Sequence, residues 1–259
     1  RDLHVAWEDL KMRIVADLHT HSVASGHAYN TIDEMARAAR DAGLELIAIT
    51  DHGPNIPGGP HLYYFGNLRV IPATIAGVEV LKGVEANIIS PAGDLDLPER
   101  SLKKLDFVLA GFHVGTGYDG GSVEENTRAM IGAMENPHVD AIAHPGNPAF
   151  QVNIEEIVRA AKRLGKLLEI NNSSLTVTRL DSRDNCFQFA RLAAAHGVTV
   201  VIGSDAHHAS RVGVVDAAVE LAERAGLTED LVLNTSLRRV TDFLRSRGKV
   251  RMELDKPEV

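Results

Sequence analysis

Cysteine and long apolar stretches are both scarce in this sequence of 259 residues. Cys186 is the single cysteine, which excludes an internal disulfide and a cysteine-rich zinc ribbon and is typical of a reducing compartment. No apolar run approaches the roughly 18 residues of a transmembrane helix. The first residues resemble neither a signal peptide nor a transit peptide. We therefore expect a cytoplasmic protein that does not enter a membrane.

Positive charge is also in short supply. Lys and Arg total 27 against 35 for Asp and Glu, which gives a formal net charge of −8. A surface that coats nucleic acid is normally basic, so this balance disfavours nucleic acid as a partner. It also disfavours an anionic substrate at first sight. However, 12 histidines in an acidic chain indicate bound metal ions, which reverse the charge locally.

Short apolar runs alternate with longer amphipathic segments along the chain. The runs predict parallel strands, covered on both faces, at residues 13–18, 44–50, 78–86, 106–112, 139–144, 166–170 and 198–204. Capping and hydrophobic patterns predict helices that start near Thr31, Ser122, Asn153, Asn185 and Ser236. Seven strands, most of them followed by a helix, indicate βα units in one domain.

The domain is predicted to span residues 13–250. Residues 1–12 are then an N-terminal extension and residues 251–259 a C-terminal tail. Met12 stands just before the first apolar run and is a candidate for the natural start of the chain. The sequence gives no indication of the oligomeric state.

Side chains that bind metal ions follow six of the seven predicted strands. In a parallel barrel the carboxyl ends of all strands meet on one face, whereas the ends of distant strands in an open sheet lie too far apart. We therefore predict an α/β, TIM-like barrel with its site at the carboxyl ends of the strands. The candidate metal ligands are His19, His21, His27, His52, Glu85, His113, His144, Asp205 and His207.

The number and type of these side chains indicate more than one metal ion. His19 and His21 are two residues apart in an extended segment, so both rings face the same side. Imidazole and carboxylate ligands together suit zinc, manganese or iron. Seven histidines and two carboxylates are too many for one ion and suit two or three. Glu85 could bridge two of them, and clustered metals commonly serve phosphoester chemistry.

Other polar residues at the predicted mouth are candidates for substrate contacts. His208 adjoins the last candidate ligand and could reach a substrate. Arg179 and Arg183 follow the sixth strand, where they could bind a phosphate or be solvated loop charges. Asn171 and Asn172 end that strand and could orient water or the metal ligands.

Several motifs resemble those of the polymerase and histidinol phosphatase (PHP) family. They are DLHTHS, TDHG, GVEAN, AGFH, AHPGNP, EINNSS and GSDAH, in chain order. The resemblance covers about residues 14–248 and is closest to the YcdX-type phosphatases. It implies a distorted seven-stranded (βα)7 barrel with a trinuclear metal site, usually zinc.

The resemblance also implies how the ligands are shared. Carried over position by position, the sets are His19, His21, Asp205 and Glu85 for the first metal, His27, His52 and His207 for the second, and Glu85, His113 and His144 for the third. Three divalent ions, zinc or else manganese or iron(II), are therefore expected. His208 stands where a smaller hydroxyl residue is expected.

The implied reaction is hydrolysis of a phosphate monoester in a small phosphorylated substrate. A hydroxide held between metals attacks phosphorus in line, with Glu85, Asp205 and His207 as the catalytic ligands. The alternatives are a histidinol-phosphate or nucleotide phosphatase of the same family, a polymerase-associated nuclease or proofreading module, and a non-catalytic metal-binding scaffold.

Overall fold

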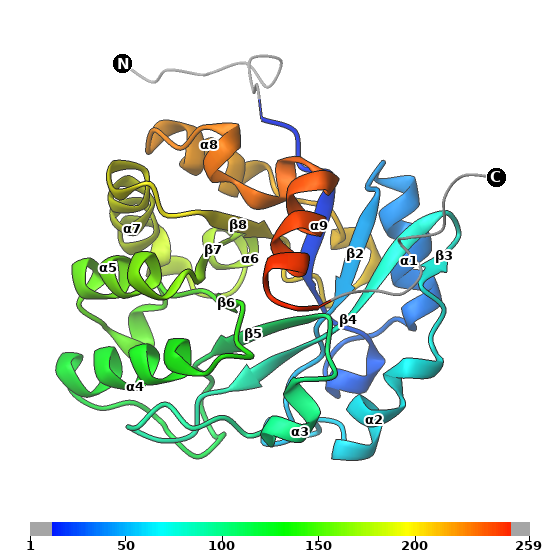
Figure 1. The fold of residues 1–259 in the computed structure, drawn as a ribbon, viewed down its shortest axis with the longest axis horizontal. Coiled ribbons are helices and arrows are strands. Elements are labelled where there is room, and N and C mark those ends of the chain that lie inside the picture. The colour runs from blue at the N-terminus through cyan, green and yellow to red at the C-terminus, as the bar shows by residue number, and fades with distance from the viewer. Residues whose placement is uncertain (1–11, 250–259) are drawn as a thin grey trace.

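Seven parallel strands lie side by side in their order along the chain (Figure 1). They are β1 (Ala16–Thr20), β2 (Leu46–Ile49), β4 (Val78–Asn87), β5 (Phe107–Gly111), β6 (Ala141–Ile142), β7 (Leu167–Asn171) and β8 (Val200–Gly203). All six neighbouring pairs are parallel, and each strand overlaps one of the predicted runs. The TIM-like barrel of seven parallel strands is therefore confirmed.

An additional short strand, β3 (Thr74–Ile75), pairs antiparallel with the start of β4. A two-residue turn joins them, and both its residues have positive φ, 53° at Ala76 and 87° at Gly77. Such a turn matches the twist of a hairpin. The sequence analysis missed β3 because two residues carry no measurable periodicity.

The structure is a computed structural model that describes residues 12–249. The predicted extension and tail therefore lie outside the described residues, apart from Met12. That residue is buried, and its backbone N–H donates to Glu223 Oε1 at 2.9 Å, so it packs with the barrel.

Helices flank the strands, and five of them are close to the predictions. They are α1 (Ile32–Asp41), α4 (Val123–Glu135), α5 (Ile154–Leu164), α7 (Arg183–His196) and α9 (Leu237–Ser246). Thr31 and Ser122 both form capping boxes, and Asn153 caps α5. Ser236 occupies the position before α9, but its side chain makes no capping hydrogen bond. The predicted side-chain cap of this helix is therefore wrong.

Four helices were not predicted. They are α2 (Leu62–Asn67), α3 (Glu99–Leu102), α6 (Asn172–Thr176) and α8 (Asp216–Arg224). Single 3₁₀ turns occur at Val23–Ser25, Leu68–Val70, Pro148–Phe150, Leu180–Ser182, Ala209–Arg211, Glu229–Leu231 and Leu233–Thr235. α2, α3 and α6 have six residues or fewer, too few to show a helical period.

The barrel interior is apolar at the end opposite to the predicted site. Leu46, Leu81, Phe107 and other interior side chains form one buried cluster with Val240 and Leu244 of α9. Figure 1 accordingly shows α9 in front of the strands. The helix covers this end of the barrel, which leaves the carboxyl ends of the strands as the accessible mouth.

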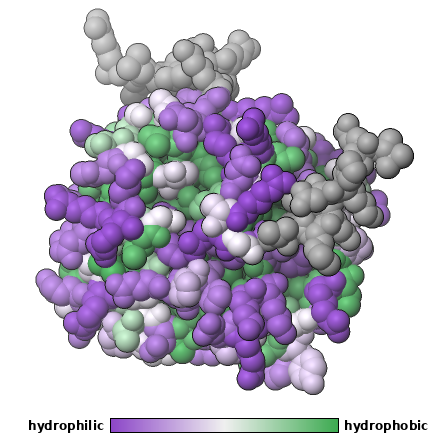
Figure 2. Space-filling model, in the orientation of Figure 1, coloured by the Kyte–Doolittle hydropathy of each residue, from purple (hydrophilic) through white to green (hydrophobic). Residues whose placement is uncertain are grey.

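The surface in the same orientation is largely hydrophilic, with apolar residues scattered between charged ones (Figure 2). Within residues 12–249, none of the helices has the length and apolar character needed to cross a bilayer.

Candidate metal centre

Interior positions change from apolar to polar toward the carboxyl ends of the strands. Because strand residues alternate between faces, an apolar interior residue places the residues two and four positions later on the same face. On β4 this sequence is Leu81, Gly83 and Glu85, and on β7 it is Leu167 followed by Glu169. Alternation alone thus carries both glutamates into the barrel at the level of the mouth.

An irregularity in β1 turns His19 toward the same space. Ala16 and Leu18 belong to the interior cluster, so simple alternation would point His19 away from it. The register of β1 against β2 shifts between Asp17 and Thr20, as it does at a β-bulge. His19 is in consequence 1% exposed, with its ring against the interior carboxylates.

Glu85 lies at the centre of the predicted ligands. Its side chain is within 3.5 Å of ring nitrogens of His19 (3.3 Å), His21 (3.5 Å), His52 (2.8 Å), His113 (3.3 Å) and His144 (2.7 Å). Oε2 faces the first three rings and Oε1 faces the last two. One carboxylate therefore joins two groups of histidines, which is the geometry of a bridging ligand.

Four of the atoms have the spacing of ligands around a single tetrahedral ion. His19 Nε2 and His21 Nε2 are 3.1 Å apart. Asp205 Oδ1 is 3.6 Å from the first and 3.2 Å from the second, while Glu85 Oε2 is 3.3 and 3.5 Å from them. Ligands at about 2.0–2.2 Å from a tetrahedral zinc ion lie about 3.3–3.6 Å from one another.

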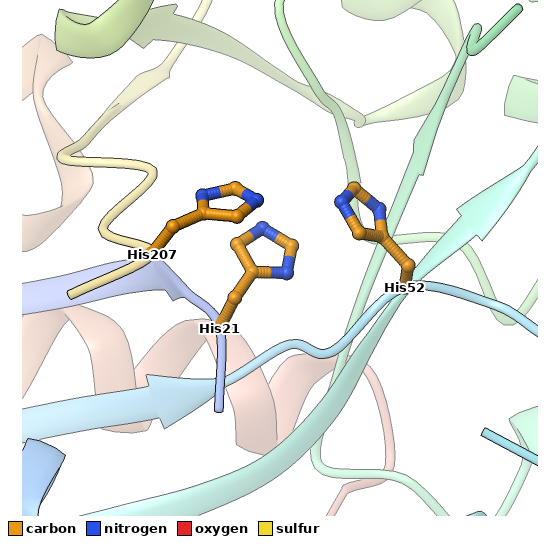
Figure 3. Close-up of side chains that lie close together, drawn as sticks. All are labelled: His21, His52 and His207. Atoms are coloured by element: carbon orange, nitrogen blue, oxygen red, sulfur yellow. The ribbon is translucent and has the colours of Figure 1, made fainter. Parts of the chain in front are cut away.

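The remaining histidines line the adjoining space. Figure 3 shows the rings of His21, His52 and His207 directed toward one another, and their ligand atoms lie within 4.8 Å. His207 Nε2 is 3.1 Å from His27 Nε2. The structure thus brings all the predicted ligands together, but it places His21 beside the second group as well as the first.

Several buried polar atoms of this cluster have no hydrogen-bond partner among the described residues. They are His52 Nδ1, Glu85 Oε2 and both ring nitrogens of His113, whose short contacts, such as His52 Nδ1 to Glu85 Oε2 at 2.8 Å, do not have hydrogen-bond geometry. A buried polar atom without a partner is costly, and here the atoms are ligand atoms that face one another. Cations placed between them would satisfy these atoms, so the residues fit a cluster of divalent metal ions.

The electrostatics of the cluster also favour bound cations. Burial opposes the charged form of His19, but Glu169, Glu85 and Asp205 outweigh it and raise the pKa of the ring well above 6.5. Burial and the neighbouring rings hold the pKa of His21 well below 6.5. Burial also opposes the charged form of Asp205, but His19 and His21 bring its pKa well below 3.8. The carboxylates thus remain charged and favour positive charge between them.

Glu169 is a residue of this site that the sequence analysis did not single out. Oε1 lies 2.7 Å from His19 Nδ1, and Oε2 accepts hydrogen bonds from the backbone N–H of His144 and from Asn171 Nδ2. A carboxylate on Nδ1 keeps the hydrogen there and directs the Nε2 lone pair toward a metal. The signal for Glu169 in the sequence was a lone carboxylate within the apolar run 166–170 that predicts a buried strand.

Two of the candidate ligands have strained backbones. φ is 34° at His144 and 56° at Asp205, in the left-handed region that such residues rarely adopt. Backbone N–H groups hold both positions, since His144 N donates to Glu169 Oε2 and Asp205 N to His19 O. Strain of this kind collects at functional sites, where it aims side chains.

The candidate substrate residues are placed less uniformly. Arg179 and His208 line a cavity of about 380 Å³ over the cluster. Arg179 Nη1 is 3.2 Å from Asp205 Oδ2. Arg183 begins α7 as an exposed side chain and is not among the residues lining this cavity.

The two asparagines at the end of β7 differ in their contacts. Asn171 Nδ2 donates to Asp205 Oδ2 at 3.2 Å, so it does orient a candidate ligand. Asn172 Oδ1 accepts from the backbone N–H of Ala218 in α8, which turns it away from the cluster. Only the first of the two therefore fits the predicted orienting role.

Comparison with known proteins gives matches of high coverage. A probable phosphatase of Caldanaerobacter subterraneus subsp. tengcongensis is 53% identical over 240 residues, which cover 93% of this chain and 94% of that protein. A probable phosphatase of Acetivibrio thermocellus is 51% identical over 91% of this chain and 97% of that protein.

A solved structure shares the fold. Histidinol phosphate phosphatase from Lactococcus lactis subsp. lactis, in complex with zinc, L-histidinol and phosphate, superposes with a TM-score of 0.59. The two are 18% identical, and the match covers 82% of this chain and 94% of that one. The family model for the PHP domain matches residues 17–173, a segment that contains most of the clustered histidines. The chain therefore belongs to the PHP domain family.

Proposed function

We propose that this chain is a metal-dependent phosphatase that hydrolyses phosphate monoesters at a site for three divalent ions, with zinc as the first candidate. The observation that carries the proposal is the convergence of seven histidines and two carboxylates at ligand spacing around Glu85. The names of the relatives, probable phosphatases, support the activity. The zinc in the histidinol phosphatase of the same fold supports the metal.

The residues of the chain have separate tasks in such a reaction. When bound, the ions supply a water of lowered pKa as nucleophile and positive charge for the phosphate oxygens. Glu85 and Asp205 would hold the ions, while Glu169 and Asn171 fix the direction of the ligands. Arg179 is anchored by Asp205 and Ser174 Oγ, with donors remaining for a phosphate oxygen.

The mouth favours a small phosphorylated substrate. Its cavity of about 380 Å³ holds a phosphate ester of modest size but not a duplex. Besides the cluster, the lining includes Arg179, His208 and Arg211 as cationic or polar groups, and Tyr29 and Val177 as apolar ones. A compact phosphate ester with an apolar part would contact both kinds of group.

Metal removal and restoration test this function. Chelator-treated protein should hydrolyse no p-nitrophenyl phosphate and should recover activity with zinc, manganese or iron(II). Elemental analysis of the active sample should give about three ions per chain, the number that nine ligands suit. Three bound ions without turnover of any monoester would favour a scaffold. Preference for bis(p-nitrophenyl) phosphate or single-stranded DNA would favour a nuclease.

Glu85→Gln tests the bridging role directly. The amide offers one ligand oxygen and no charge where the carboxylate offers two oxygens, so bound metal should fall and kcat/KM should drop by more than about 100-fold. Glu155→Gln, at an exposed position on α5, is the control and should keep full activity. Full activity and metal content in Glu85→Gln would refute the bridge. A panel with histidinol phosphate, nucleoside monophosphates and sugar phosphates then separates the substrate alternatives.

A further inference from the structure

Asp51 is a buried carboxylate beside the cluster that touches none of the candidate metal ligands through its side chain. It is 0% exposed, although His52 follows it directly in the chain. Four donors surround it: Ser22 N at 2.6 Å, Ser22 Oγ at 2.7 Å, Ser25 Oγ at 2.7 Å and the hydroxyl of Tyr64. A carboxylate surrounded by so many donors acts as an acceptor and is fixed in place.

The hydrogen bonds of Ser25 can be assigned completely. Its single hydroxyl hydrogen goes to Asp51 Oδ1, because an ionised carboxylate can only accept. The oxygen then accepts from the backbone N–H of His52 at 3.1 Å, since an amide N–H can only donate. One lone pair is left, and His21 Nδ1 lies 3.1 Å from this oxygen. His21 must therefore carry its hydrogen on Nδ1.

This assignment decides what the other side of the ring can do. A neutral imidazole with its hydrogen on Nδ1 has a bare lone pair on Nε2. His21 Nε2 is the atom that lies 3.2 Å from Asp205 Oδ1 and 3.1 Å from His19 Nε2, inside the cluster. The hydroxyl of Ser25 thus presents the metal-binding atom of His21 to the site.

We propose that Asp51, acting through Ser25, is the positioning residue that locks His21 in the tautomer able to bind a metal ion. The proposal rests on the proposed function only in taking His21 as a metal ligand. Asp51 fixes the direction of the Ser25 hydroxyl, and Ser25 fixes the ring. With Glu169 on His19, both histidines of the DLHTHS segment then have a dedicated partner on Nδ1.

Tyr64 completes the arrangement from the outside. It belongs to α2, one of the helices that the sequence did not predict, and its hydroxyl donates to Asp51 Oδ2. Ser22 Oγ donates to the same oxygen. These bonds hold Oδ2 away from the cluster, so Oδ1 remains directed at Ser25. The short helix α2 thereby contributes to the orientation of a ligand that directly follows β1.

The test compares Ser25→Ala and Asp51→Asn with a matched buried variant. Asp17→Asn serves as the control, because Asp17 is equally buried but accepts from the backbone N–H groups of His19, Ser204 and Gly213 and from the Ser204 side chain, and not from Ser25. Three measurements are made on each protein: imidazole ¹H–¹⁵N spectra of the metal-free form, zinc affinity by chelator competition, and the midpoint of thermal unfolding.

Ser25→Ala should convert His21 from the Nδ1–H tautomer to a mixture and weaken zinc binding about 10–100-fold, as loss of a partner behind a ligand does. Asp51→Asn should act in the same direction by a smaller factor, since its amide oxygen still accepts from Ser25 without the charge. Asp17→Asn should lower the unfolding midpoint and leave the His21 tautomer unchanged.

Two results would overturn the proposal. One is an unchanged Nδ1–H tautomer in Ser25→Ala, with zinc affinity within about threefold of the parent protein, a change smaller than partners of metal ligands normally produce. The other is an equal change of tautomer in Asp17→Asn, which would indicate general loosening. Absence of zinc binding by the parent protein would instead contradict the proposed function, while the metal-free spectra would still decide the role of Ser25.

Discussion

His19 and His21 show how the surroundings of single residues prepare a metal site. Glu169 occupies Nδ1 of the first ring and Ser25 that of the second, so both Nε2 atoms face the same space. These two nitrogens, 3.1 Å apart, repel each other unless a proton or a cation lies between them. The carboxylates of Glu85 and Asp205 make the cation the better occupant.

Glu169→Gln should impair the site without emptying it. Both carboxylate oxygens accept hydrogen bonds, from His19 Nδ1 on one side and the His144 backbone on the other. A glutamine must turn its NH₂ group toward one of these donors. We expect metal affinity and kcat/KM to fall about 10–100-fold, measured by chelator competition and steady-state kinetics.

The control for this prediction is Glu155→Gln, at an exposed helix position where the same substitution should change neither quantity. A Glu169→Gln protein with the metal affinity of the parent would contradict an orienting role for this carboxylate.

Cys186 provides a second test at this scale. Its side chain is 1% exposed in α7, and burial, with a contribution from Glu169, raises the pKa of the thiol to about 12. Thiol reagents attack the thiolate, which is then about one part in ten thousand at pH 8 and grows only as the pH approaches 12. Ellman's reagent should therefore label the folded protein at a negligible rate and the guanidinium-unfolded protein completely. Rapid labelling at pH 8 without denaturant would contradict this packing.

The sequence predicts the candidate metal ligands better than it predicts the residues that orient them. Chemically suitable residues at strand ends, such as His113 and His144, stand out because they follow apolar runs. Glu169 contacts His19 of another strand, and Ser25 contacts His21, four residues before it. Nothing in the sequence around Glu169 or Ser25 indicates these contacts. Their roles depend on which strands the barrel brings together, which is set by tertiary structure.

At the scale of elements, long amphipathic segments are largely predictable, and short or weakly marked ones are not. α1 and α4 begin with capping boxes and were found from the sequence. α8 begins after Val215, which offers no side-chain cap. α6 is capped by Asn171, whose side chain accepts from Ser174 N, but its five residues are too few to show a helical period. Packing against neighbouring elements has to supply the stability of such segments.

The close contact of β8 with its neighbours requires a glycine. A Cβ on Gly203 would lie 2.3 Å from Glu169 Oε1 and 2.8 Å from His19 Cβ. Gly203→Ala should displace the carboxylate from His19, weaken zinc binding about 10-fold and lower the free energy of unfolding by about 1–3 kcal/mol. Zinc competition and urea unfolding measure the two effects.

Gly66→Ala is the matched control, since no atom lies within 4 Å of a Cβ at this position in α2. It should leave zinc binding unchanged and stabilise the protein by at most about 1 kcal/mol. Equal effects of the two substitutions would show that the crowding at Gly203 is relieved elsewhere.

At the scale of the whole molecule, strand order and site position follow from the chain, but barrel closure does not. Parallel neighbours are expected wherever βα units repeat. β1 and β8, however, form no continuous ladder in residues 12–249; one isolated bridge, Thr20–Ala206, joins the end of β1 to a residue beyond β8. At the other end a side chain, Asn234, takes the place of the ladder. An asparagine in a loop offers no sequence signal for such a role.

Asn234→Ala should therefore open the seam of the barrel. Asn234 is 0% exposed; Nδ2 donates to Ala16 O and Ile202 O at 2.7 Å each, and Oδ1 accepts from Ile202 N. Its loss leaves buried backbone groups unpaired at about 1–3 kcal/mol each, so we expect the free energy of unfolding to fall by about 2–4 kcal/mol. Urea unfolding measures it, with Asn67→Ala, at an exposed position, as a control that should change stability by less than about 0.5 kcal/mol. Because β1 carries His19 at this seam, zinc should stabilise the Asn234→Ala protein and recover part of the lost free energy of unfolding. A loss of stability that is the same with and without zinc would show that barrel closure is independent of the metal site.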